Sequence, residues 1–138
     1  MDIRYPARFE AQADGGFFVQ FVDLADTFTE GRTEEEALFN AVDVLSAMLE
    51  LKLEEGAEIP EPTPNLADAR YVAPDARTQA ALLVRRARGE QSLAHLARVL
   101  DTSWPAVQRL EDPRHWPSLK SLDRAAAALG RRLVLSFE

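Results

Sequence analysis

The sequence predicts an α+β protein in two parts. The first half should hold three strands and one long helix, and the second half should be all helical with a short terminal strand. Apolar and polar residues alternate over the first 30 residues, which is typical of half-buried strands. Apolar residues then recur at helical spacing. The sign of the charge also changes between the two halves, near residue 75.

Three strands are expected before residue 32. Residues 2–9 alternate, and so do residues 17–21 after the turn signal at residues 14–16, so these two segments should form a hairpin. Residues 26–30 are the third strand, which Gly31 ends.

A long helix should follow the strands. Thr33 and Glu36 have the spacing of a capping box, in which the threonine caps the helix and the glutamate reaches back. Apolar residues continue at helical spacing to about Glu55, and Gly56 should end the helix. The helix should pack on one face of the sheet.

A proline-rich segment separates the two halves. It contains four prolines: Pro60, Pro62, Pro64 and Pro74. Alternating prolines favour an extended, semi-rigid spacer. We therefore predict a first domain over residues 1–58, a linker over 59–75 and a second domain over 76–138.

The second domain should contain four helices and a terminal strand. The helices are expected at about 76–88, 92–100, 103–111 and 118–129. Residues 133–137 have no strand to pair with in a helical domain. Pairing with the same segment of a second chain would satisfy the backbone and form a dimer.

Charge divides the chain in the same way. The net charge is −7, but residues 1–75 hold 17 acidic and 5 basic residues, whereas residues 76–138 hold 6 and 11. Such asymmetry suggests two different partners, with nucleic acid for the basic half and a basic protein for the acidic half. There is no cysteine and no long apolar run, so we expect a cytoplasmic protein with no membrane segment.

Residues 92–111 resemble the helix-turn-helix of Cro and the phage repressors. Ser92 and Ser103 are good N-caps, and Ala97 is small where the two helices cross. Four apolar residues occupy the core positions of that motif: Leu96, Leu100, Val107 and Leu110. Asp101 stands where the turn usually has glycine.

In such a motif the N-terminal residues of the second helix enter the major groove of DNA. The predicted base contacts are Ser103, Trp104, Pro105, Gln108 and Arg109. The predicted phosphate contacts are Arg98, Arg114 and Lys120. Trp104 could belong to the core instead. Glu111 is expected to form a structural ion pair with Arg86. The alternative function for the whole helical domain is protein docking in place of DNA binding.

The first half resembles the HicB antitoxin family. The resemblance rests on five strings, which keep the family's order and spacing: Tyr5–Ala7, Asp14–Val19, Phe21–Leu24, Thr29–Ala37 and Gly56–Pro62. It implies a partial RNase H-like β-β-β-α domain. It also implies a HicA-type toxin partner that cleaves mRNA, repression of the shared operon through operator DNA, and a homo-oligomer (a dimer or a tetramer).

No enzyme and no cofactor are expected. The sequence has no Ser-His-Asp arrangement, no phosphate-binding glycine loop and no histidine cluster for a metal. One alternative is a repressor whose first domain senses a small ligand in an apolar pocket. Another is a residual magnesium-dependent nuclease, for which Asp14 and Asp23 are the candidates near strands.

Overall fold

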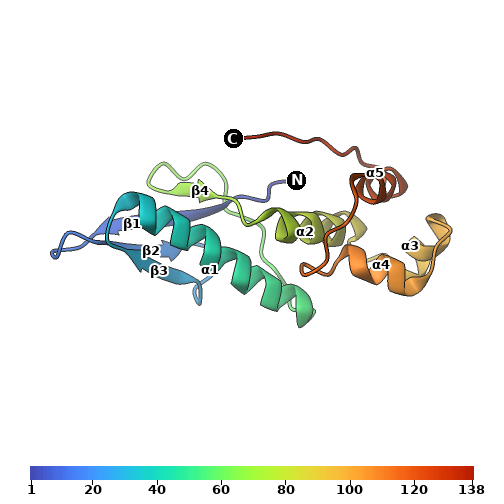
Figure 1. Cartoon of the computed structure of the whole chain (residues 1–138), viewed down its shortest axis with the longest axis horizontal. Coiled ribbons are helices and arrows are strands. Elements are labelled where there is room, and N and C mark those ends of the chain that lie inside the picture. The colour runs from blue at the N-terminus through green and yellow to red at the C-terminus, as the bar shows by residue number, and fades with distance from the viewer. The chain divides into compact units, whose positions relative to one another are not determined.

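The structure, a computed structural model, describes residues 1–138, which divide into two compact units, Met1–Ala76 and Arg77–Glu138. The chain is a mixed α+β protein with one four-stranded antiparallel sheet and five helices, so the predicted class is confirmed. The sheet lies in the first unit (Figure 1). None of the helices has the length and apolar character needed to cross a membrane.

The three predicted strands are present as β1 (Tyr5–Ala11), β2 (Phe17–Phe21) and β3 (Phe28–Gly31). The strand order is β3-β2-β1-β4. Alternation decides the two faces. Ala7 pairs with Phe21, and both are buried on the face that the long helix covers, whereas the next pair, Arg8 and Gln20, lies on the other face.

A fourth strand, β4 (Arg70–Val72), lies in the range that the sequence analysis predicted to be a spacer over residues 59–75. It pairs with β1 in antiparallel register, with Tyr5 opposite Val72. The prolines do favour extended backbone here, but three residues are too few to show period-two alternation. The unpaired edge of β1 provides the hydrogen bonds that turn this extended segment into a strand.

Helix α1 (Glu34–Glu54) packs along one face of the sheet, against β2 and β3 (Figure 1). The predicted N-cap is confirmed, because the Thr33 hydroxyl accepts a hydrogen bond of 3.1 Å from Glu36 N. The helix ends before Gly56, as predicted, and Gly56 has a φ of 64°. Side chains from both layers form the core: Tyr5, Ala7, Val19, Phe21, Ala41, Leu45 and Leu49.

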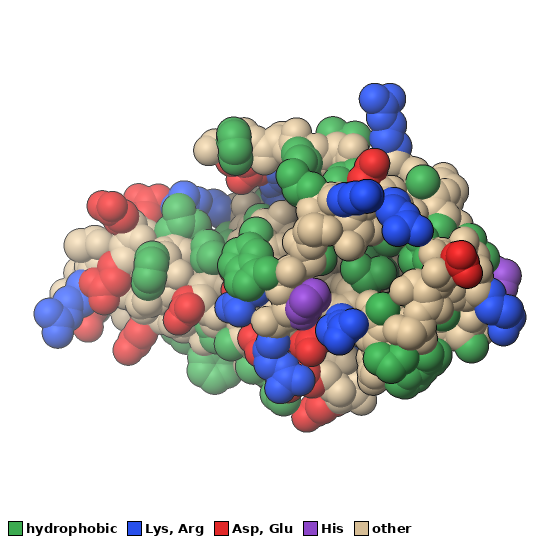
Figure 2. Space-filling model, turned by 45° about the vertical axis from the view of Figure 1, so that its right-hand side comes forward, with side chains coloured by type: hydrophobic (Ala, Val, Ile, Leu, Met, Phe, Trp, Pro, Cys, Tyr) green, Lys and Arg blue, Asp and Glu red, His purple; other side chains and the backbone are tan.

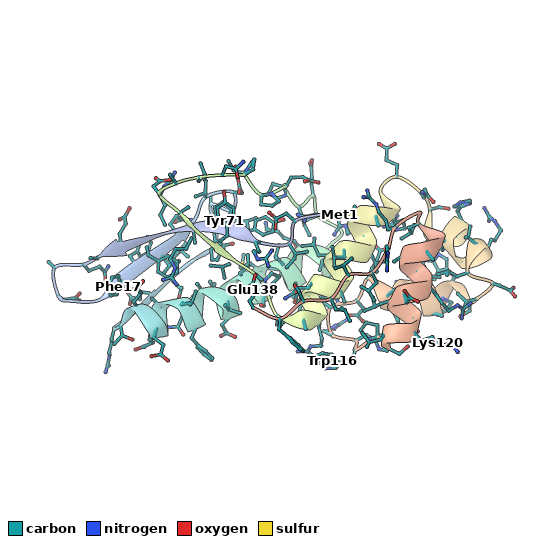
Figure 3. All side chains as sticks on the ribbon, turned by 90° about the horizontal axis from the view of Figure 1, so that it is seen from above. Met1, Phe17, Tyr71, Trp116, Lys120 and Glu138 are labelled. Atoms are coloured by element: carbon teal, nitrogen blue, oxygen red, sulfur yellow. The ribbon has the colours of Figure 1, made fainter.

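The proline-rich segment is hydrogen-bonded to the sheet unit at several points. The Tyr5 hydroxyl donates to Pro60 O at 2.7 Å, and the Tyr71 hydroxyl donates to Thr63 O at 2.6 Å. Thr63 also binds the Asp23 carboxylate through its backbone N at 2.9 Å and its hydroxyl at 2.5 Å. Tyr71 is labelled on this segment in Figure 3.

Four helices form the second unit, within about one residue of the predicted bounds: α2 (Ala76–Arg88), α3 (Leu93–Val99), α4 (Trp104–Leu110) and α5 (Leu119–Ala128). The predicted N-caps are confirmed. The Ser92 hydroxyl accepts from His95 N at 3.0 Å, and the Ser103 hydroxyl accepts from Ala106 N at 3.3 Å.

Two small apolar clusters hold these helices together. One contains Val84, Leu110 and Ala125, with Leu100 and Leu122 packed against it. The other contains Leu96, Ala97 and Val107, with Leu93, Leu100, Ala128 and Leu129 packed against it. All four core positions that the sequence predicted belong to these clusters.

The terminal strand predicted over residues 133–137 is not present in the single chain. Residues 131–138 form no helix or strand, and the side chains of Val134, Leu135 and Phe137 are exposed. A strand requires a hydrogen-bonded neighbour, and no segment of the same chain pairs with this one.

Candidate nucleic-acid interface

A tight turn connects α3 to α4. Asp101 adopts a φ of 51°, in the left-handed region, as its position at the turn predicted. Asp101 N donates to Arg98 O at 3.1 Å, and Thr102 N donates to Ala97 O at 3.0 Å. These two bonds form a Schellman motif, which satisfies the last carbonyl groups of α3 and sets the direction in which α4 begins.

The two helices pack closely behind this turn. Leu96 of α3 and Val107 of α4 are both 0% exposed, and Ala97 is 7% exposed beside them. A larger side chain at position 97 would force the helices apart, because cores at native density have no room for added methylene groups. The packing therefore fixes which face of α4 is turned outward.

The outward face of α4 carries the five predicted base-contact residues. All of them are exposed: Ser103, Trp104, Pro105, Gln108 and Arg109. Trp104 is 47% exposed, so it is not a core residue, and the alternative raised for it is wrong. The Arg109 guanidinium has no ion-pair partner within the chain, so its donors are available to a ligand.

The predicted phosphate contacts are also exposed, but they differ in their local pairing. Arg98 and Lys120 have no ion-pair partner in the chain. Arg114 Nε lies 3.3 Å from Asp112 Oδ1, which offsets its charge. Burial acts to raise the pKa of Asp112, but the hydrogen bonds from Arg114 outweigh it and lower this pKa. Figure 3 labels Lys120 on the first turn of α5.

One further cation near the turn was missed by the sequence analysis. Arg124 is exposed, and its Nη2 donates to Leu100 O, at the end of α3, over 3.2 Å. The available signal was its spacing from Lys120, because residues four apart share one face of a helix. Figure 2 shows Lys and Arg side chains in blue over the surface of the helical unit.

The ion pair that braces α4 involves a different arginine from the predicted one. Arg88, not Arg86, binds Glu111: its Nε lies 2.5 Å from Oε2 and its Nη2 lies 2.9 Å from Oε1. The Arg88 side chain is 19% exposed and that of Glu111 is 11% exposed. The hydrogen bond to Glu111 raises the pKa of Arg88 above the ordinary value of an arginine. This two-pronged contact ties the end of α2 to the end of α4.

The carboxylates considered for a magnesium site are engaged in local structure. Asp14 accepts a hydrogen bond from Gly16 N at 3.1 Å in the hairpin turn, and Asp23 binds Thr63. No group of three or more His, Asp or Glu side chains converges in the way that a metal ion would require.

Comparison with known proteins shows that the sequence is similar to one protein family. Residues 4–79 match the family described as "HicB_like antitoxin of bacterial toxin-antitoxin system". Antitoxin HicB 1 of Photorhabdus laumondii is 31% identical over 137 residues, which cover 99% of this chain and 88% of that protein. Antitoxin HicB 2 of the same organism is 33% identical, covering 97% of this chain and 96% of that protein. Antitoxin HicB of Escherichia coli K12 is 28% identical, covering 96% and 98%. The similarity thus includes both units.

Proposed function

The chain belongs to the HicB-like antitoxin family, and from this premise we propose that it neutralises a HicA-type, mRNA-cleaving toxin and represses its own operon. The relatives support the antitoxin role. One observation supports assigning toxin binding to the first half and DNA binding to the second: the two halves of the sequence have opposite net charge.

The acidic first unit is suited to a toxin that handles RNA. A protein that binds RNA needs a basic surface to approach the phosphates. The excess of 17 acidic over 5 basic residues in residues 1–75 is complementary to such a surface. Complementary charge raises the association rate and the selectivity for the partner. In this proposal the unit is a partial RNase H-like domain that acts by binding and not as an enzyme.

The basic second unit is suited to operator DNA. We propose that α3, the Asp101 turn and α4 are a helix-turn-helix and that α4 enters the major groove. Arg109 would read guanine and Gln108 would read adenine, each through two hydrogen bonds. Arg98 and Lys120, both exposed, would bind phosphates. Arg114 would contribute less, because Asp112 already binds it.

A repressor of this type binds two half-sites as a dimer. We propose that the exposed apolar tail around Val134, Leu135 and Phe137 pairs with the same tail of a second chain. The pairing would join residues 133–137, which form no strand in the single chain, into a two-stranded ribbon. The domain limits proposed on this basis are 1–58 for toxin binding, 59–75 for a linker that also adds β4 to the sheet of the first unit, and 76–138 for DNA binding and dimerisation, in a cytoplasmic protein.

The test is a growth experiment with the short open reading frame next to the gene. Cells would express this neighbour alone, with the full chain, with residues 1–76, or with residues 77–138. The 1–76 fragment includes β4, because β1 would otherwise lose its partner strand. We expect the neighbour to arrest growth, and the full chain and residues 1–76 to restore it. A harmless neighbour, or arrest that the full chain does not relieve, contradicts the antitoxin proposal.

A further inference from the structure

The sheet of the first unit has one face covered by α1 and a second face that faces away from the helix. Strand register places Glu10, Phe18 and Glu30 side by side on this second face, in one row across β1, β2 and β3. Their neighbour Val19 points the opposite way and is 0% exposed. We call the row, together with Phe28 of β3, the outer-face patch.

Two aromatic rings form the centre of the patch. The ring centroids of Phe18 and Phe28 lie 6.1 Å apart, on the diagonal between β2 and β3. Phe28 is 54% exposed, which is high for a phenylalanine on a strand. Phe18 is half-buried beside it. A pair of neighbouring aromatic rings with one ring largely exposed is typical of a binding surface.

Two carboxylates flank the rings. The side chains of Glu10 and Glu30 are exposed, and neither has an ion-pair partner in the chain. The one cation on the same face of these strands, Arg8, is already bound to Asp68 at 2.8 Å. The patch is therefore apolar at its centre and negatively charged on both sides.

The chemistry of the patch fits an arginine or a lysine of a partner. A guanidinium or ammonium group stacks on an aromatic face, and its aliphatic stem covers apolar surface. Carboxylates on both sides then supply charge-assisted hydrogen bonds. An anionic lipid or a nucleic-acid surface would be repelled by the two glutamates, so a basic protein is the occupant that the charges favour.

The β3 edge of the sheet is a weaker candidate for docking than this face. β3 is an edge strand, and an unpaired edge could accept another strand. However, Asn40 Nδ2 of α1 donates to Glu30 O at 2.9 Å and so occupies one backbone acceptor of β3. A partner strand would have to displace this bond, whereas the outer face needs no rearrangement.

We infer that the outer-face patch is the surface on which the first unit docks the basic toxin, with an arginine or lysine of the toxin over Phe18 and Phe28, between Glu10 and Glu30. The inference rests on the proposed function. It adds the residues that bind the partner and the type of partner side chain that they select.

The test uses the full chain and the purified product of the adjacent open reading frame, recovered from the co-expressed complex. Binding would be measured by calorimetry at two salt concentrations for the unaltered chain, Phe28→Ala, Glu30→Lys and the double variant Glu10→Gln/Glu30→Gln. Phe39→Ala is the matched control, because Phe39 is 71% exposed on α1. Circular dichroism would verify that each variant is folded, and Glu30→Lys alters only an exposed charge.

We expect Phe28→Ala and Glu30→Lys each to weaken binding by about tenfold or more, as central interface residues do. The glutamine double variant should also reduce the salt dependence of binding, because it removes two charges. Phe39→Ala should bind within about twofold of the unaltered chain.

Three outcomes would overturn the inference. If Phe28→Ala and Glu30→Lys bind like the unaltered chain, the partner docks elsewhere, and a loss with Phe39→Ala would place it on α1. If light scattering shows that these variants instead dissociate an oligomer of the free chain, a second copy occupies the patch. If co-expression with the unaltered chain yields no complex with the product of the adjacent frame, the proposed function fails and this inference fails with it.

Discussion

Replacing Gly31 by alanine should destabilise the first unit far more than a methyl group normally does. Gly31 ends β3 where the strand meets the first turn of α1. A Cβ atom there would lie 2.6 Å from Ala37 Cα and closer still to Ala37 N. The obstructing atoms are backbone, and they cannot rotate away. They are also held in place, since Ala37 N donates to Thr33 O at 2.9 Å.

The expected loss in the free energy of unfolding follows from how far α1 must move. Carbon atoms pack at about 3.5–4.0 Å, so the start of α1 would have to retreat by about 1 Å. Overpacking of a rigid site costs about 1–3 kcal/mol, and loss of the Thr33 cap adds about 1 kcal/mol. We therefore expect a loss of about 3 kcal/mol. Gly56→Ala is the matched control: its φ of 64° brings strain, but no atom lies within 4 Å, so it should cost about 1–2 kcal/mol.

Hydrogen exchange read peptide by peptide is the suitable assay, because local opening free energies can differ between the two units. In Gly31→Ala we expect the opening free energy to fall by about 3 kcal/mol in peptides from β1–β3 and α1. Peptides from α3 and α4 should be unchanged, because the clusters around Val107 and Leu110 contain only residues of the second unit. A loss no larger than that of Gly56→Ala would refute the close-contact argument. An equal loss in both units would show that they do not open separately.

Four further predictions concern the second unit. Arg109→Ala should reduce discrimination at one base position by roughly 1–3 kcal/mol in competition binding with single-base operator variants, and unchanged operator affinity would exclude α4 as the reading helix. Arg98→Ala should instead weaken binding to all sequences and lower the slope of affinity against salt by about 1, as titrations at several salt concentrations would reveal. Glu111→Ala leaves the charge of Arg88 poorly solvated and without its carboxylate partner. Urea unfolding should therefore show a loss of about 2 kcal/mol in the free energy of unfolding of the second unit. If the free energy does not fall, the pair does not stabilise the fold. Deleting residues 133–138 should lower the mass seen by light scattering and weaken binding to a two-fold operator, whereas an unchanged oligomer would rule out pairing through the tail.

The elements that the sequence predicted correctly depend on neighbours within one helical turn or one hairpin. The caps at Thr33, Ser92 and Ser103 each bond to a backbone N–H three residues ahead. The left-handed residue at Asp101 likewise depends on the local turn. Because these interactions join residues close in sequence, their patterns are visible without knowledge of the fold.

The features that the sequence missed depend on segments that are distant along the chain. β4 is a strand only because the edge of β1, more than 60 residues earlier, pairs with it. Positions 86 and 88 differ by about 200° around a helix, so the rotation of α2 in its packing decided which arginine meets Glu111. The register of three strands likewise decided that Phe18 lies between Glu10 and Glu30.

The sequence by itself therefore determined the α+β class, the limits of the helices, the opposite charge of the two halves and the resemblance to HicB antitoxins. Each of these follows from composition or from short-range periodicity. Only the tertiary structure decided that Trp104 lies on the surface, that Arg88 braces α4, and that two phenylalanines and two glutamates share one exposed face. Side-chain partners depend on how helices rotate and how strands align, and packing of the whole unit sets both.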